Sequence, residues 1–236
     1  MPKRDDDDQD AGEANLSRGE LVHLKLLDAI RGGRYAPGDR VREADVAAWL
    51  NVSRTPVREA FRRLQADGLL TMEPWRGVIV AQLDQQQLVE LYAMRRVLEG
   101  TAAGLAAQHA APSQIAILTS LADQADNATK PGERADLNRI FHQHIYAAAH
   151  NRYLLQALNA LRDSMALLPS TTYALEGRHA NTQKEHRQII DAISRRDTAA
   201  AEAAARDHIE AAEKARLQVI IALEEKNRET TKEDGT

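Results

Sequence analysis

Three of the eight histidines in the sequence lie at spacings that would let them share a metal ion. Asn138 and His142 are four residues apart, so on a helix they share one face and can approach one atom. His186 and His208 flank residues 195–197, the expected turn between the last two helices. At 1.5 Å per residue both lie ~15–17 Å from that turn, level with one another. The spacing therefore allows three imidazoles and one amide oxygen to converge inside a helical bundle.

Such a ligand set would leave coordination positions open to water or to a ligand. The chain has no cysteine, so nitrogen and oxygen must hold any metal. An open three-histidine site can also activate water, which makes a metallohydrolase that acts on a small carboxylate an alternative. Glu185 is a poor general base for it, because it lies about 100° around the helix from His186. Without a metal, the alternative is buried histidines that bond to backbone carbonyls or to one another.

Arg95 is a second candidate for chemistry, because it lies in an otherwise apolar helical segment, residues 91–98. An arginine in such a place can hold a carboxylate through two parallel hydrogen bonds. Glu99 lies four residues further on and offers the alternative of an internal salt bridge. The residues alone favour that salt bridge.

A third group of residues is typical of a helix that meets DNA. Arg58 and Arg62 lie on one face of this helix, and Arg54 lies just before its first turn, where the helix dipole attracts phosphate. Thr55 as the N-cap and Pro56 as the first helical residue predict where the helix begins. The opposite face is an apolar stripe with helical spacing: Val57, Ala60, Phe61 and Leu64.

The flanking segments predict a winged helix-turn-helix around that helix. A short helical run, residues 44–50, precedes it by three residues. Two short strands follow, residues 68–72 and 78–81, joined by a turn that contains Arg76 and Gly77. This order within about forty residues is typical of DNA-binding domains and outweighs the alternative of a solvated arginine face. In the metallohydrolase alternative, this DNA-binding domain is appended to the enzyme. A nucleoid-type architectural protein is a further alternative, but it would need no buried ligand set.

The fold class expected from the whole sequence is mainly α, in two domains. Residues 1–18 are acidic and almost without apolar side chains, which predicts a disordered tail. Residues 19–82 form the winged helix-turn-helix. Residues 84–225 show helical periodicity and predict an all-helical bundle of six or seven antiparallel helices. Residues 226–236 are polar and predict a frayed tail.

The charge distribution agrees with a DNA-binding segment in an otherwise acidic chain. The formal net charge of the chain is −4, but residues 19–80 hold ten basic and eight acidic side chains. This section is net-positive, whereas residues 1–18 and residues 81–236 are both net-negative. Such a surplus on one face can serve phosphate contacts. No apolar run approaches the ~18 residues that read as a membrane span, and the N-terminus has no signal-peptide pattern. We therefore expect a cytoplasmic protein without a membrane partner.

The residues described above resemble GntR-type transcriptional regulators of the FadR subfamily, whose helical effector-binding domain is called FCD. The resemblance covers about residues 19–225. Its most specific parts are residues 52–60 and 138–142, with support from residues 91–100. It implies a homodimeric repressor that binds a palindromic operator in double-stranded DNA and responds to a small organic acid.

The resemblance also implies particular DNA contacts. Arg54, Thr55 and Arg58 would contact the operator in the major groove, with a glycine at the wing tip. Arg42 is a further candidate, since some relatives carry the contacting arginine where this chain has Ala44. The complete set of candidate DNA-binding residues is Arg42, Ser53, Arg54, Thr55, Arg58, Arg62, Arg76 and Gly77.

In metal-binding members of that family the ligands are an Asp or Asn and three His, positions that Asn138, His142, His186 and His208 fill. The resemblance favours zinc first and nickel second. Asparagine keeps the oxygen donor but removes a negative charge, which weakens the site for a divalent cation. Arg95 matches a family arginine near the effector pocket. This moves its role as a carboxylate clamp ahead of the salt bridge.

Overall fold

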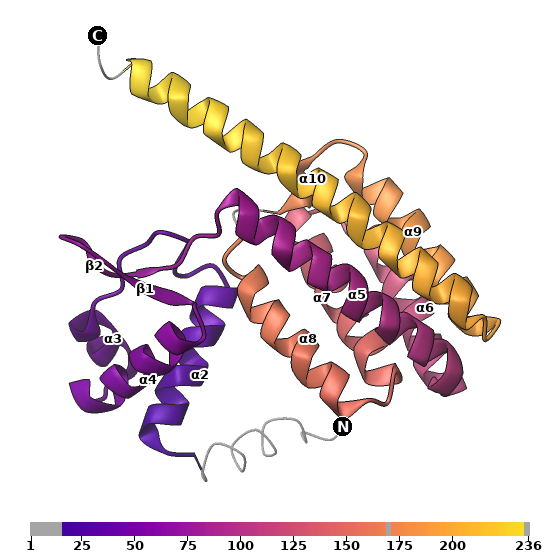
Figure 1. Cartoon of the computed structure of the whole chain (residues 1–236), viewed down its shortest axis with the longest axis horizontal. Coiled ribbons are helices and arrows are strands. Elements are labelled where there is room, and N and C mark those ends of the chain that lie inside the picture. Colours follow the sequence, from indigo (N-terminus) through magenta and orange to yellow (C-terminus); the bar gives the residue numbers. More distant parts are fainter. Residues whose placement is uncertain (1–15, 169–170, 234–236) are drawn as a thin grey trace. The chain divides into compact units, whose positions relative to one another are not determined.

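The computed structural model describes residues 16–168 and 171–233 (Figure 1). The chain divides into two compact units, one that runs to Leu83 and includes Arg162–Leu168, and one formed by the remainder. Residues 1–15 of the acidic tail predicted for residues 1–18 lie outside the described residues. None of the helices within the two described ranges combines the length and the apolar character of a membrane-spanning segment.

The first unit contains three helices followed by an antiparallel hairpin. This confirms the predicted winged helix-turn-helix, and Arg40 extends the hairpin by a bridge to Ile79. The first helix begins one residue earlier than expected, because Ser17 and Glu20 form a capping box at its start. The elements are α2 (Arg18–Arg31), α3 (Glu43–Leu50), α4 (Arg54–Ala66), β1 (Leu70–Glu73) and β2 (Gly77–Val80).

Helix α4, the predicted DNA-reading helix, begins at Arg54. Its N-cap is Ser53, whose φ of −70° and ψ of 166° are extended, so the prediction that Thr55 is the N-cap is wrong. Pro56 is the third helical residue, where its missing amide hydrogen is still harmless because the first four have no intrahelical partner. Asn51, the C-cap of α3 in the turn before α4, has a φ of 52°. This is a left-handed conformation that asparagine tolerates.

The predicted apolar stripe of α4 is buried. It packs against α2, whose Leu26 and Ile30 are also buried, and Leu167 belongs to the same core. The buried residues of the stripe are Val57, Ala60, Phe61 and Leu64. Burying this face of α4 leaves the opposite, arginine-bearing face to the surface.

The second unit is the predicted all-helical bundle, with six α-helices and one short 3-10 turn among the residues described. Helix α10 continues past residue 225, where the sequence predicted its end, because no Gly or Pro interrupts it before Gly235. Residues 226–233 are therefore helical, and residues 234–236 lie outside the described range. The elements are α5 (Gln85–His109), α6 (Pro112–Asn127), α7 (Pro131–Ala148), α8 (Arg152–Met165), η1 (Thr172–Ala174), α9 (Arg178–Ser194) and α10 (Thr198–Glu233).

Helices α5 and α10 lie side by side and form the most extensive pairing of the bundle (Figure 1). Two glycines of α5 permit this approach. A Cβ atom at Gly104 would lie 2.6 Å from Cγ of Glu202, and one at Gly100 would lie 2.8 Å from Cγ of Arg206. The close approach of α5 and α10 places side chains from both helices in the same interior, where α7 and α9 also contribute residues.

Candidate metal centre and DNA-binding surface

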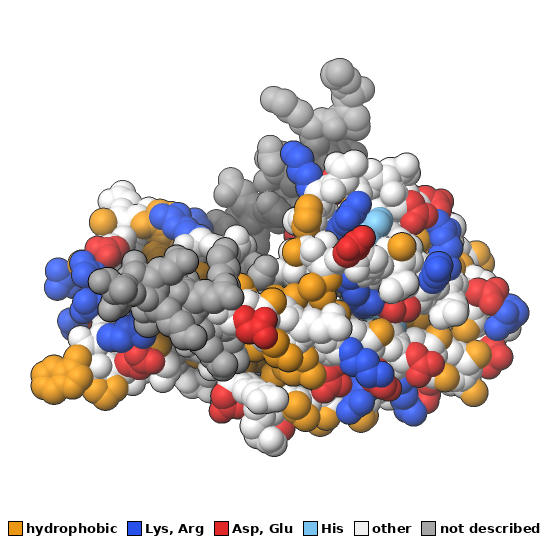
Figure 2. Space-filling model, turned by 90° about the horizontal axis from the view of Figure 1, so that it is seen from above, with side chains coloured by type: hydrophobic (Ala, Val, Ile, Leu, Met, Phe, Trp, Pro, Cys, Tyr) orange, Lys and Arg blue, Asp and Glu red, His pale blue; other side chains and the backbone are white. Residues whose placement is uncertain are grey.

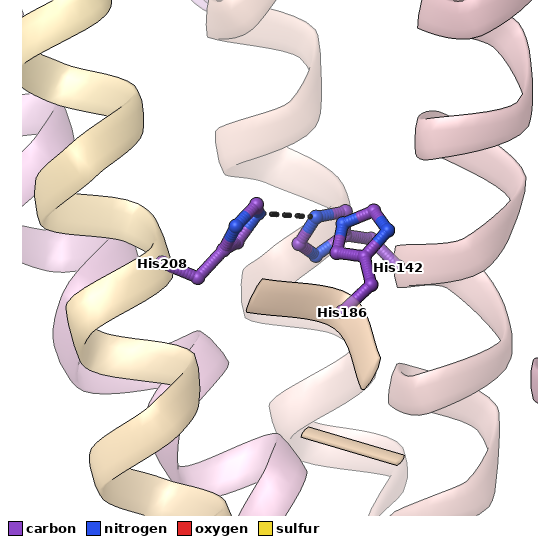
Figure 3. Close-up of side chains that lie close together, drawn as sticks. All are labelled: His142, His186 and His208. Atoms are coloured by element: carbon purple, nitrogen blue, oxygen red, sulfur yellow. Dashed lines mark hydrogen bonds between the residues drawn. The ribbon is translucent and has the colours of Figure 1, made fainter. Parts of the chain in front are cut away.

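Three histidines from three helices converge inside the bundle (Figure 3): His142 of α7, His186 of α9 and His208 of α10. Each is buried, with 7%, 2% and 2% of its surface exposed, respectively. One ring nitrogen of each lies within 4.8 Å of the others. The ring centroids of His186 and His208 are 4.9 Å apart, so the two are level as their spacing predicted. Phe141 stacks on His186 with ring centroids 4.0 Å apart.

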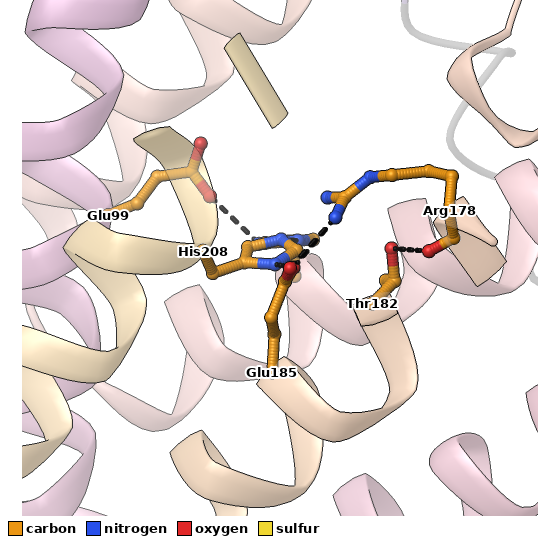
Figure 4. A network of polar contacts seen from close by, with 6 residues as sticks. Glu99, Arg178, Thr182, Glu185 and His208 are labelled. Atoms are coloured by element: carbon orange, nitrogen blue, oxygen red, sulfur yellow. Dashed lines mark hydrogen bonds and ion pairs between the residues drawn. The ribbon is translucent and has the colours of Figure 1, made fainter. Parts of the chain in front are cut away.

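Two of the imidazoles each have a carboxylate next to their Nδ1 atom. Nδ1 of His208 lies 2.7 Å from Oε2 of Glu185 (Figure 4). Nδ1 of His142 lies 2.8 Å from Oε2 of Glu99, a short contact that is less well aligned as a hydrogen bond. The two Nε2 atoms, of His142 and His208, face each other at 3.1 Å. The carboxylates and the facing Nε2 atoms therefore lie on opposite sides of the rings.

Arg95 forms the internal ion pair with Glu99, with Nε 2.7 Å from Oε1. Burial alone would raise the pKa of Glu99, but the charge of Arg95, the close contact with His142 and a hydrogen bond from Tyr146 hold that pKa well below its usual range. Burial likewise opposes the charge of Arg95, but Glu99 outweighs it and raises the arginine pKa. The pair is charged, so the salt bridge weighed from the sequence is present. An effector contact by Arg95 stays a prediction.

The three histidines fit a metal. Burial, followed by repulsion from the other two histidines, lowers the pKa of His186 well below its usual value. Burial, then His142 and Arg178, does the same for the pKa of His208. Neutral imidazole is the form that binds metal. Nε2 of His186 is buried and has no hydrogen-bond partner among the described residues.

The distance between the Nε2 atoms of His142 and His208 also fits a shared metal ion. Two nitrogen ligands at about 2.0–2.1 Å from a tetrahedral zinc lie roughly 3.3–3.4 Å apart, and the Nε2 atoms of His142 and His208 are 3.1 Å apart. Asn138 lies one turn before His142 on α7 and is half-buried. Its amide oxygen as a fourth ligand stays a prediction.

Sequence reasoning missed the contacts of Glu99 and Glu185 with the histidines, and it missed the ion pair of Glu185 with Arg178. Nη1 of Arg178 lies 2.9 and 3.0 Å from the two carboxylate oxygens of Glu185. The angle between Glu185 and His186 on α9 makes Glu185 a poor base beside that histidine, but its partner in the structure is His208 of α10. A signal was present: Arg178, Thr182 and Glu185 recur at i, i+4 and i+7, which places three polar side chains on one face of α9.

Lys and Arg side chains gather on the surface of the winged unit (Figure 2). All candidate DNA-binding residues are exposed except Gly77, which is half-buried at the start of β2. Nε of Arg58 lies 2.9 Å from Oε2 of Glu43, which follows Arg42. This contact joins α4 to the first residue of α3, next to the candidate Arg42. Arg76 and Gly77 form a separate group on the wing.

The wing carries one residue that sequence reasoning missed. Trp75, in the turn between β1 and β2, is fully exposed and has a φ of 67°, a conformation rare for a bulky residue. Beside it, Arg76 donates to Glu73 at 2.9 Å and to the carbonyl oxygen of Gly38 at 3.0 Å. The indole is thus presented to solvent on a turn that is tied to the rest of the unit.

Two family models match the chain, the FCD domain at residues 90–211 and the bacterial regulatory proteins of the gntR family at residues 19–80. A "Probable D-xylose utilization operon transcriptional repressor" of Paenarthrobacter nicotinovorans is 37% identical over 86% of this chain and 91% of its own. The galactonate operon transcriptional repressor of Escherichia coli is 28% identical over 80% of this chain and 93% of its own.

A solved GntR transcriptional regulator from Rhodococcus sp. RHA1 has a TM-score of 0.70 and 28% identity, with 86% of this chain and 99% of that chain covered. The FCD match is consistent with the FadR subfamily. The relatives are regulators, so the comparisons favour regulation over the metallohydrolase alternative. The chain belongs to the GntR family of transcriptional regulators and carries an FCD domain.

Proposed function

We propose that this regulator is a repressor that binds a palindromic operator as a homodimer and is released by a small organic acid. A two-fold dimer presents two copies of α4 to two half-sites of double-stranded DNA. The observation that carries the effector proposal is the convergence of three buried histidines in the FCD domain. The relatives' names refer to different metabolites, D-xylose and galactonate, so the effector class rests on the chemistry of the site.

We assign a divalent metal to this site, zinc first and nickel second, with Asn138, His142, His186 and His208 as ligands. When bound, it supplies an electrophilic centre for one carboxylate oxygen of the effector. Arg95 is the residue we assign to the effector's carboxylate, with its guanidinium oriented by Glu99. Release requires that the effector bind the DNA-free arrangement more tightly, since equal affinity for both arrangements shifts nothing.

The test begins with a duplex selected by the protein from a random-sequence pool. The selected sequence should be palindromic, and it should bind two chains per duplex. A panel of small carboxylates is then added to the bound complex, and fluorescence anisotropy reports release. We expect at least one carboxylate to release the zinc-loaded protein and to fail after chelation. Release that is equal with and without zinc would contradict the metal-assisted mechanism.

Trp75→Ala is expected to weaken binding to the selected duplex about tenfold. An exposed indole at a wing tip can bury apolar area against the sugars and bases of the minor groove, at ~25 cal/mol per Å². The matched control is Met72→Ala, which removes the side chain of a residue that is 62% exposed on β1 and outside the turn. Equal affinity of Trp75→Ala and Met72→Ala would show that the indole has no part in binding.

Tryptophan fluorescence gives an independent test of contact between Trp75 and DNA. The chain has two tryptophans, Trp49 and Trp75, so replacing Trp49 leaves Trp75 as the source of the emission. Trp49 lies against Arg34, whose Cζ is 3.8 Å from the ring centroid. In a Trp49→Phe background, Trp75 emission should change when the duplex is added.

A further inference from the structure

The site contains a repeated arrangement of arginine, carboxylate and imidazole. On one side Arg178 holds Glu185, which holds Nδ1 of His208 (Figure 4). On the other side Arg95 holds Glu99, which contacts Nδ1 of His142. In both cases Nε2 points the other way, toward its counterpart at 3.1 Å.

The hydrogen-bonding capacity of these groups determines where the protons are. The Glu185 carboxylate, paired with Arg178, has only acceptors, so Nδ1 of His208 must be the donor. In a neutral imidazole the proton on Nδ1 leaves a lone pair on Nε2. His142 reaches the same state if Nδ1 donates to Glu99. Two lone pairs would then face each other, an arrangement that a cation between them relieves.

We infer that Glu185 and Glu99 are positioning residues that fix the Nδ1–H tautomers of His208 and His142 and so preset their Nε2 atoms as metal ligands. This inference rests on the metal site of the proposed function. Partners of this kind orient ligand rings and raise their basicity, and their loss typically lowers metal affinity about 10–100-fold. The arginines, in turn, hold the two carboxylates in place through the ion pairs of Arg178 with Glu185 and of Arg95 with Glu99.

A purely structural role must be distinguished from this one, because Glu185 is also the ion-pair partner of buried Arg178. Removing Glu185 alone would leave Arg178 as a buried, unpaired charge, which is strongly destabilising. The informative comparison is therefore Arg178→Met, which keeps the carboxylate behind His208, and the double variant Arg178→Met/Glu185→Met, which removes it without leaving a charge. Glu185 is preferred to Glu99 as the target because its side chain is 19% exposed, against 3% for Glu99.

The experiment uses the full chain and zinc alone as the probe. Zinc affinity is measured by competition with a chromogenic chelator, and thermal unfolding verifies that each variant folds. We expect Arg178→Met, which keeps the carboxylate but not the arginine that holds it, to lose less than about tenfold in zinc affinity, and the double variant to lose about 10–100-fold. If the two variants lose affinity equally, Glu185 acts only through its ion pair and the inference is overturned.

Side-chain ¹⁵N NMR of the metal-free, unmodified protein gives a reading that needs no variant. The expected result is a proton on Nδ1 of His208, retained in Arg178→Met. A proton on Nε2 of His208 would overturn the inference even if the double variant failed to fold. Failure of the unmodified protein to bind zinc would instead contradict the proposed metal site, so the two failures are distinguishable.

Discussion

Arg58→Ala is expected to weaken operator binding about 5–150-fold, the range for loss of one bidentate contact to a base, ~1–3 kcal/mol. Arg58 lies on the exposed face of α4, and its contact with Glu43 is 2.9 Å long but open to solvent. An exposed pair of this kind is worth about 0–1 kcal/mol, so the guanidinium can turn to DNA at little cost. Anisotropy titration of the selected duplex at fixed salt measures the change.

The matched control for Arg58 is Arg63→Ala, which removes the same charge from the same helix. Nη1 of Arg63 lies 3.7 Å from Oε1 of Glu20 in α2, and Arg63 is not among the candidate DNA-binding residues. Its loss should weaken binding only through the smaller total charge, with no change in sequence preference. If Arg58→Ala bound the duplex as tightly as Arg63→Ala, α4 would not be the recognition helix.

Saturating zinc is expected to raise the unfolding temperature of the helical domain by on the order of 10 °C. A ligand that binds only the folded state at 100 times its dissociation constant adds about 2.7 kcal/mol, and a domain of this size gains a few degrees per kcal/mol. The shift should vanish in His186→Ala/His208→Ala, which removes ligands from α9 and α10. Differential scanning fluorimetry with and without a chelator measures it.

His144→Ala is the control for that experiment. It removes an imidazole from α7 only two residues from His142, on another face of the helix and outside the three-histidine group. Zinc should stabilise this variant as much as it stabilises the unmodified protein. Loss of the shift in His144→Ala would mean that zinc binds elsewhere.

The features that depend on the regular repeat of the α-helix were predictable from the sequence. The apolar stripe of α4 follows the 3.6-residue helix, so its buried face followed from spacing. His186 and His208 are level because equal distances from a turn remain equal in antiparallel helices. The start of α4 was less predictable, because Ser53 and Thr55 both suit an N-cap and proline is tolerated anywhere in the first turn.

Contacts that depend on how helices rotate against one another were not predictable. The sequence shows only the angle between Glu185 and its neighbour His186, but the partner of Glu185, His208, comes from another helix. Which face of α9 meets α10 is decided by packing over the whole bundle, including the close approach at Gly104. Trp75 lies in a turn, where no period signals which side chains are exposed.

The most direct test of a metal centre in this regulator is elemental analysis of protein purified without chelator and without a nickel column. About one zinc or nickel per chain is expected, and the metal should be absent from His142→Ala/His186→Ala. Absence of metal from the unmodified protein would contradict the metal centre and return the three histidines to a packing role. An equal metal content in the double variant would place the metal outside this site.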